Sequence, residues 1–190
     1  MRHSLTIAIL TIVFIVCQST TFGQTSSDSS KIQKLSAATE RARAGFLVGT
    51  FTTTSLIPPM PSIPKGVTGN GTSSVTWALD SMFLSIEEES YSTFMGHFKQ
   101  HGMLGYDPQA HEFVLSMFNS TGDHPTYHGN FEGDTLVLQT KIQAPKASFD
   151  QKLQWFKDGD AVKLNVLNDF GSGFLLIYEQ TSTPASQKMK

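Results

Sequence analysis

The chain has 190 residues, a formal net charge of −2 and one cysteine, Cys17. A charge so close to zero gives no electrostatic footprint for nucleic acid or for an anionic membrane surface, so neither is expected as a partner. The length is that of one domain with a core of its own.

Residues 1–23 have the pattern of a secretory signal peptide. A short basic start precedes an apolar run from Leu5 to Val16, and about 12 residues are too few to cross a bilayer as a helix, which needs roughly 20. Thr21 and Gly23 are small residues placed for a cut before Gln24. We therefore expect a secreted or periplasmic protein, cleaved near Gly23-Gln24.

Cleavage there would change the charge and the cysteine content. It would remove Arg2 and Cys17, which leaves 13 basic against 16 acidic residues, a net charge of −3, and no cysteine. Disulfides, thiolate catalysis and Cys-ligated zinc are then excluded, and no stable membrane insertion is expected. The alternative is a lipoprotein anchored through Cys17, although no small residue directly precedes this cysteine.

A polar linker and one short helix are expected next. Residues 24–30 are a disordered linker by composition. Ser30 can cap a helix over Lys31–Ala44, and Gly45 is expected to end it. The alternative is a disordered basic spacer.

From Phe46 onward the pattern is that of short strands joined by turns. β-Branched and aromatic residues alternate with polar ones, and Gly, Pro, Asn and Asp mark the breaks. Residues 56–71 are read as a Pro/Gly loop, and residues 183–190 as a flexible tail. Strands are expected at residues 46–55, 72–79, 82–91, 97–106, 112–118, 127–131, 135–143, 148–156, 161–167 and 174–181.

These elements predict an all-β fold in one domain, residues 31–182. No helical crossover separates the strands, so neighbours are antiparallel, and closing the meander removes its two edges. We expect an antiparallel up-and-down β-barrel of about ten strands with one short N-terminal helix, monomeric or weakly dimeric. A β-sandwich is the alternative.

Four stretches resemble a known family. The order and spacing of "GYDP" and of "GNFEGDTL" are more specific than either stretch alone. The stretches are "LVGTF" (47–51), "SVTWALDSMFL" (74–84), "GMLGYDPQAHEFV" (102–114) and "YHGNFEGDTLVL" (127–138). In these stretches the chain is similar to the DUF1579 family of bacterial proteins. It departs from the family pattern at Phe51 and Met117, where the family has Trp.

The resemblance implies a lipocalin-like (calycin) barrel and carries no established activity. A related ten-stranded branch, the nitrobindin-like proteins, binds haem through a Gly- and Trp-rich first strand and a late axial histidine. Here the first strand reads "GTFTTTS" and no histidine follows His128. No haem or other cofactor is expected.

The stretch from Gly102 to Phe118 raises the question of a catalytic loop. Asp107 suits the first position of a turn and Pro108 the second, so turn chemistry accounts for both. Tyr106 and Phe113 are then expected to touch across the paired strands. The alternative is a catalytic pair of Asp107 and His111.

Polar candidates for chemistry are few. His97 and His101 are about 13 Å apart on a strand and cannot chelate one ion together, and no metal site is expected. Glu88 follows Leu84 and Ile86 inward if those two face the core. The polar candidates for an active or binding site are Glu88, His101, Tyr106 and His128.

The fold and composition favour a binding protein over an enzyme. A barrel of about ten strands can be wider than its own side chains fill, so we expect a small apolar or amphipathic ligand in the lumen. The lumen candidates are Trp77, Phe83, Phe113, Met117, Phe131 and Trp155. The alternatives are an isomerase or hydrolase using the polar candidates, and a packed barrel that binds only another protein.

Overall fold

The computed structural model describes residues 36–144 and 147–185, so the expected leader and linker lie outside the described residues. The described chain is a short helical segment followed by ten strands. They are β1 (Gly49–Ile57), β2 (Val67–Ala78), β3 (Phe83–Ser92), β4 (Gly96–Asp107), β5 (Glu112–Asn119), β6 (Thr126–Glu132), β7 (Thr135–Ala144), β8 (Ala147–Asp158), β9 (Ala161–Asp169) and β10 (Phe174–Pro184).

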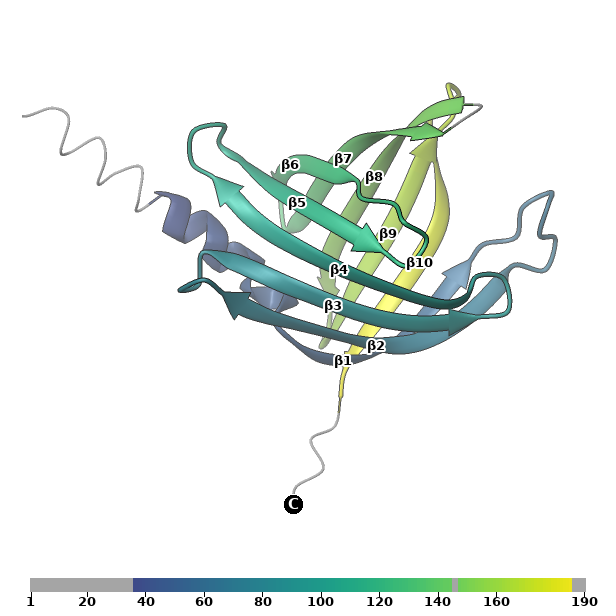
Figure 1. The fold of residues 1–190 in the computed structure, drawn as a ribbon, viewed down its shortest axis with the longest axis horizontal. Helices are drawn as coiled ribbons and strands as arrows, with labels where there is room; N and C mark the ends of the chain where they lie inside the picture. Colours follow the sequence, from purple (N-terminus) through teal and green to yellow (C-terminus); the bar gives the residue numbers. More distant parts are fainter. Residues whose placement is uncertain (1–35, 145–146, 186–190) are drawn as a thin grey trace, which may run out of the picture.

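The ten strands form a closed antiparallel barrel, which confirms the predicted fold class (Figure 1). Each strand pairs with its neighbour in sequence, and β1 also pairs with β10, from Phe51 opposite Pro184 to Leu56 opposite Glu179. Within the described residues the sheet therefore has no free edge, because the first and last strands complete each other's hydrogen bonds.

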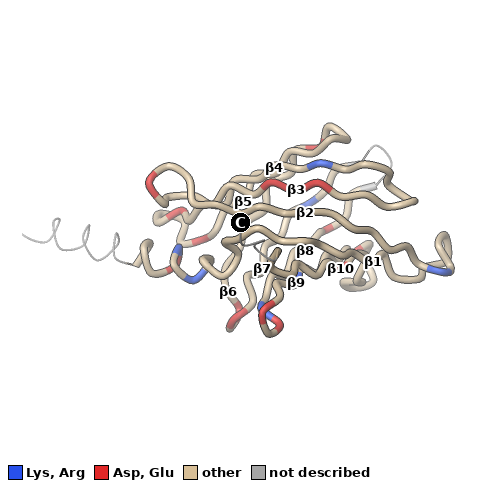
Figure 2. Tube along the Cα trace, turned by 90° about the horizontal axis from the view of Figure 1, so that it is seen from below, with Lys and Arg blue, Asp and Glu red and all other residues tan. Residues whose placement is uncertain are grey.

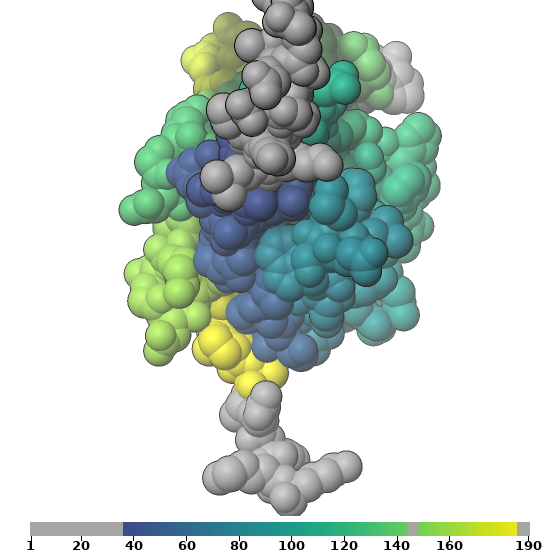
Figure 3. Space-filling model, turned by 90° about the vertical axis from the view of Figure 1, so that its left-hand side faces the viewer, coloured from purple at the N-terminus to yellow at the C-terminus, as the bar shows by residue number. Residues whose placement is uncertain are grey.

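A helical segment covers one end of the barrel. Residues 36–43 are α-helical, and Ala44–Leu47 continue as a 3₁₀ turn, η1. The segment lies across the centre of this end, among the strand ends (Figure 3). The expectation that Gly45 ends the helix is wrong, because burial of Ala44 and Leu47 against the barrel keeps the chain helical past it. Residues 31–35 of the predicted helix lie outside the described residues.

One arginine ties this segment to the strands. The Arg43 guanidinium donates to the Gly133 carbonyl at 2.8 Å, in the turn between β6 and β7. It also lies 4.1 Å from the centre of the Phe131 ring, a cation–π contact. Phe131 packs edge-on against Phe46 and Phe113. We call the end of the barrel that the helical segment covers the plugged end, and its interior is an aromatic and aliphatic core.

Among the described residues, no helix has the length and apolar character needed to span a membrane.

Alternation along the strands separates an inner from an outer face. On β3, Leu84, Ile86 and Glu88 are buried. The residues between them belong to the outer face, and the acidic run of β3 lies along the middle of the barrel wall (Figure 2). Residues paired on neighbouring strands point to the same face of the sheet. The pairing of β3 with β2 and β4 therefore identifies the inward-facing residues of those strands as well.

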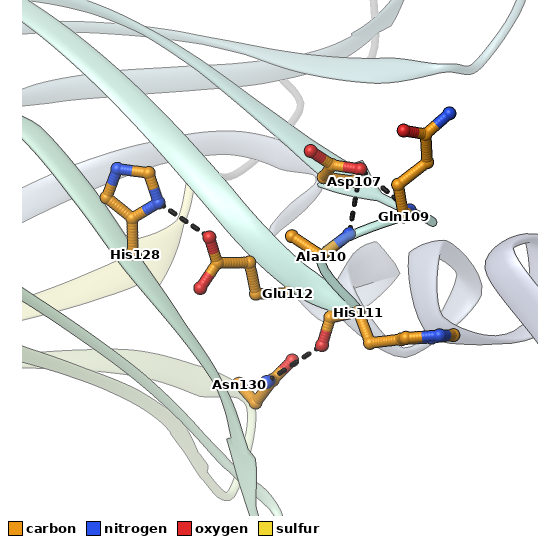
Figure 4. Close-up of polar contacts among 7 residues, drawn as sticks. All are labelled: Asp107, Gln109, Ala110, His111, Glu112, His128 and Asn130. Atoms are coloured by element: carbon orange, nitrogen blue, oxygen red, sulfur yellow. Dashed lines mark hydrogen bonds and ion pairs between the residues drawn. The ribbon is translucent and has the colours of Figure 1, made fainter.

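The turn between β4 and β5 is the predicted hairpin (Figure 4). The Asp107 Oδ1 atom accepts hydrogen bonds from the backbone N–H groups of Gln109, at 2.8 Å, and Ala110, at 3.2 Å. These two bonds lower the pKa of the Asp107 carboxyl. Tyr106 lies opposite Phe113 with ring centres 5.2 Å apart, which confirms the expected aromatic contact. Asp107 is therefore a turn-maker that sets the register of β4 and β5.

Two strand boundaries differ from the predicted ones. Val67–Gly71, read from sequence as part of a loop, belongs to β2, and Thr183 and Pro184, read as tail, belong to β10. Glycine is required at residue 71 because a Cβ there would lie 2.2 Å from the Glu89 carbonyl oxygen on β3. Glycine at this position therefore allows two strands to approach closely and does not form a turn. The end of β10 is ordered as a strand because it pairs with β1.

Two phenylalanines of β5 test the assigned faces. Phe113 is 1% exposed and Phe118 is 55% exposed. We expect Phe113→Ala to lower the free energy of unfolding by about 3–5 kcal/mol, because it leaves a cavity in the plugged core. The matched change Phe118→Ala should alter it by no more than about 0.5 kcal/mol. Urea unfolding followed by circular dichroism measures both, and equal losses would contradict the assignment of faces.

Candidate functional site

The end of the barrel opposite the helical segment holds a cavity of about 260 Å³. Its described wall mixes aromatic, aliphatic and uncharged polar side chains with one carboxylate, and no described Lys, Arg or His is part of it. The lining residues are Ser55, Ile57, Val67, Glu88, Ser90, Tyr91, Ser92, Met95, Gly96, Phe98, Gln100, Met117, Asn119, Pro125, Tyr127, Gln151, Leu153, Trp155, Leu164, Val166 and Tyr178. A smaller void of about 40 Å³ lies deeper and shares Glu88, Gln100 and Met117 with it.

Glu88 is the charged residue of this cavity, and it is only 8% exposed. Gln100 of β4 and Gln180 of β10 both donate from Nε2 to the Glu88 Oε2 atom, at 3.1 and 3.3 Å. The Tyr178 hydroxyl donates in turn to Gln180 Oε1 at 2.7 Å. We call Glu88, Gln100, Gln180 and Tyr178 the Glu88 network.

Burial governs the protonation of the network. Removal from water raises the pKa of the Glu88 carboxyl, and the hydrogen bonds from Gln180 and Gln100 offset only part of the rise. Burial, and then the charge of Glu88, raises the pKa of the Tyr178 hydroxyl. Among the described residues no basic side chain pairs with Glu88.

A second polar chain crosses the opposite wall of the cavity. The Tyr127 hydroxyl donates to Gln151 Oε1 at 2.5 Å, and Gln151 Nε2 donates to Asn168 Oδ1 at 3.0 Å. Burial raises the pKa of Tyr127 to about 12, so its hydroxyl stays protonated and acts as a donor at neutral pH. The lumen thus has two hydrogen-bonded polar strips with apolar wall between them.

The six lumen candidates lie in different places. Met117 and Trp155 line the cavity. Phe113 and Phe131 belong to the plugged core, and Trp77 lies near Gly45 at that end, 37% exposed. The remaining candidate, Phe83, does not face the lumen, because it precedes the inward-facing Leu84 by one residue.

Glycines explain two of these positions. Phe83 covers Gly105 on the outer face, where a Cβ would lie 2.5 Å from the Phe83 ring. Met117 lies over Gly102 in the lumen, where a Cβ would lie 2.5 Å from the Met117 Sδ atom. Both glycines make room for a large neighbour on the paired strand.

Of the four polar candidates, the structure places only Glu88 in the cavity wall. His101 contacts Glu87 at 2.6 Å on the outer face, and His128 contacts Glu112 at 2.8 Å, also outside (Figure 4). Tyr106 packs in the plugged core, where burial and the nearby charge of Glu40 raise its pKa. The four side chains therefore do not converge.

The outer face carries a shallow hollow of about 590 Å³ over β1 to β5. On this face Glu87 pairs with His101 and Glu89 with Lys99, and Glu88 also borders the hollow. In the part of the chain that the structure describes, no three His, Cys, Asp or Glu side chains are grouped so as to hold a metal ion.

Three residues of the Glu88 network, Gln100, Gln180 and Tyr178, are not among the residues predicted from the sequence. Their signal is weak, because glutamine and tyrosine are ordinary residues on an exposed strand face. Alternation along β4 could have indicated Gln100, because it lies two residues before Gly102 and four before Leu104, which both face the lumen. The position of Gln180 beside Glu88 depends on barrel closure, which joins residues 92 apart in sequence.

Comparison with known proteins gives one family. The family described as "Protein of unknown function (DUF1579)" matches residues 40–165, which run from the helical segment to β9. A comparison with curated proteins finds none that matches this chain.

The raised pKa of Glu88 predicts a pH-dependent cost to stability. Between the pKa of the unfolded chain, about 4.3, and the raised pKa of the fold, the folded protein holds a proton that the unfolded chain has lost. Stability therefore falls as pH rises through this window. Glu88→Gln cannot ionise, so its free energy of unfolding relative to the wild type should grow from pH 4 to pH 8.

The control is Glu87→Gln, one residue away on the outer face, where the side chain is 64% exposed. Urea unfolding at pH 4, 6 and 8 measures all three proteins. If the difference in free energy of unfolding between Glu88→Gln and the wild type does not change with pH, the Glu88 carboxyl does not have the raised pKa of a buried group.

Proposed function

Because this chain belongs to the DUF1579 family, whose function is unknown, we propose a function from its own cavity: the barrel binds a small amphipathic molecule in its lumen. The observation that carries the proposal is the division of the interior. One end is plugged and packed, with six large side chains under 2% exposed, whereas the other end keeps about 260 Å³ of space.

The volume bounds the size of the ligand. Pockets for drug-sized molecules begin at about 300 Å³, and the cavity of about 260 Å³ lies just below that range. The deeper void of about 40 Å³ borders the same Glu88 and Met117 side chains and extends the available depth. A molecule with a short chain or a single ring fits such a space.

The chemistry of the wall supports an amphipathic ligand. Leu153, Leu164 and Val166 offer apolar surface, and burial of apolar ligand surface provides the main driving force. The Glu88 network and the Tyr127 chain provide polar groups that orient a ligand. This combination of apolar wall and few polar groups is typical of small-molecule sites.

The arrangement favours binding over catalysis. An acid–base mechanism needs at least two groups that reach the same reacting atoms. Glu88 lies in the cavity wall, but His101 and His128 are outside the barrel and engaged with Glu87 and Glu112. Of the four polar candidates for an isomerase or hydrolase, only Glu88 therefore reaches the cavity.

We also propose that the protein acts after export, on the strength of residues 1–23. Their short apolar run and small residues before Gln24 have the features of a cleavable signal peptide. An exported barrel would meet ligands in the periplasm or the surrounding medium.

A neutral amphiphile tests the binding site directly. We expect 1-hexanol to bind the protein with a dissociation constant below about 1 mM, a free energy near 4 kcal/mol, and to change the fluorescence of Trp155 in a Trp77→Phe background. Val166→Trp should abolish this binding because the new ring fills the cavity.

The matched control is Asn165→Trp, on the outer face of the same strand, which should bind 1-hexanol as the wild type does. Isothermal titration calorimetry gives the affinities, and thermal unfolding checks that each variant is folded. Binding by folded Val166→Trp equal to that of Asn165→Trp would contradict a lumen site.

Export has its own measurement. Mass spectrometry of the intact protein purified from its own host is expected to give a chain that begins at Gln24. A mass that includes residues 1–23, or a lipid attached at Cys17, would contradict cleavage before Gln24.

A further inference from the structure

Resting on the proposed function, we infer that the ligand is a small organic cation, such as an alkylamine. Its ammonium group binds the Glu88 carboxylate, and its apolar body lies along the ring-lined wall toward the mouth of the barrel. This assigns Glu88 as the residue that selects the ligand by charge.

The charge of the cavity wall is the first argument. Among the described residues, Glu88 is the only charged side chain that lines the cavity, and no described Lys, Arg or His joins it there. The charged neighbours on β3 and β4 belong to the outer face, where Glu87 pairs with His101 and Glu89 with Lys99. Within the described cavity wall, a cation therefore meets one negative group without a basic partner, whereas an anion meets no positive one.

The hydrogen bonds of Glu88 are the second argument. Both amide donors, from Gln100 and Gln180, use the same oxygen, Oε2. No described residue donates to Oε1, yet in the described part of the chain no fully buried polar side-chain atom lacks a partner. The Oε1 atom is therefore accessible, and because Glu88 lines the cavity, it is available there to a donor on a ligand.

The network also fixes the carboxylate in place. Gln100 is the register partner of Glu88 on β4, and the Tyr178 hydroxyl fixes the Gln180 amide from β10. Three strands thus hold the acceptor before a ligand arrives, so little side-chain freedom is lost on binding.

Aromatic rings complete the environment for a cation. Tyr91, Phe98, Tyr127, Trp155 and Tyr178 all line the cavity. The electron-rich faces of such rings attract ammonium groups, Trp and Tyr more than Phe. Tyr91, near the end of β3, and Met95, in the turn that follows, lie at the mouth, which offers apolar contact to the rest of the ligand.

The same features disfavour a carboxylate ligand. A fatty acid in this lumen would bring a second negative charge close to Glu88, so one of the two groups would have to be protonated. An alcohol can donate to Oε1 but cannot neutralise it. The expected order of affinity is amine, alcohol, acid.

Three molecules with the same six-carbon chain test the inference: hexylamine, 1-hexanol and hexanoate, titrated into the protein at pH 7.5 by calorimetry. We expect hexylamine to bind at least about tenfold more tightly than 1-hexanol, since a hydrogen bond to a charged group is at stake, and hexanoate to bind most weakly. Glu88→Gln should remove the preference for the amine, because the neutral amide carries no charge to pair with the ammonium group. Glu87→Gln, on the outer face, should keep the wild-type order.

The comparison among ligands in the wild type needs no variant, so the inference can fail even if Glu88→Gln does not fold. Equal binding of amine and alcohol, tightest binding of hexanoate, or an amine preference that persists in Glu88→Gln would each overturn it. If one of these three results occurs while 1-hexanol binds the wild type and not Val166→Trp, the proposed function stands and only the cation is rejected. If none of the three molecules binds, both fall.

Discussion

The pairing of β1 with β10 is the constraint on which the rest of the molecule depends. Six residues of β1 lie opposite residues of β10 in this ladder, which closes the meander into a barrel. Once the sheet is closed, each strand residue faces either the lumen or the outside. Closure also brings Gln180, near the end of the described chain, to Glu88 on the third strand. The candidate site is thus a product of topology as much as of any local stretch of sequence.

The two ends of the lumen differ: one is packed and stabilises the fold, and the other contains the cavity. At the plugged end, Phe113, Leu84 and Leu136 are almost fully buried, and burial of such side chains stabilises the barrel. At the open end, polar groups replace apolar ones, and burying them would be unfavourable without partners. The Glu88 network and the Tyr127 chain supply those partners. The exception is Glu88, whose buried carboxyl has no basic partner among the described residues, so that its ionisation lowers the stability of the barrel.

How far the sequence predicts the structure depends on how local the cause is. The turn at Asp107 and Pro108 is set by residues next to each other, and it could be predicted. The strand at Val67–Gly71 could not, because only the approach of β3 to Gly71 shows that this glycine is not in a loop. On β3, Phe83 and Glu88 were both proposed for the lumen, although residues five apart on a strand face opposite sides. Alternation alone could have removed Phe83, whereas the partners Gln100 and Gln180 required the register of the closed barrel.

The place of Met117 over Gly102 has a consequence for how the shape of the lumen can evolve. The glycine leaves a recess in the wall, and an unbranched thioether side chain with three rotatable bonds fills it. The width of the lumen at this level is therefore set by a side-chain rotamer and not by the backbone. The thioether can turn aside without bending a strand, and a single substitution at either residue would widen or narrow the cavity. Selection can in this way reshape the lumen, and with it the range of the proposed ligands, while every strand pair stays as it is.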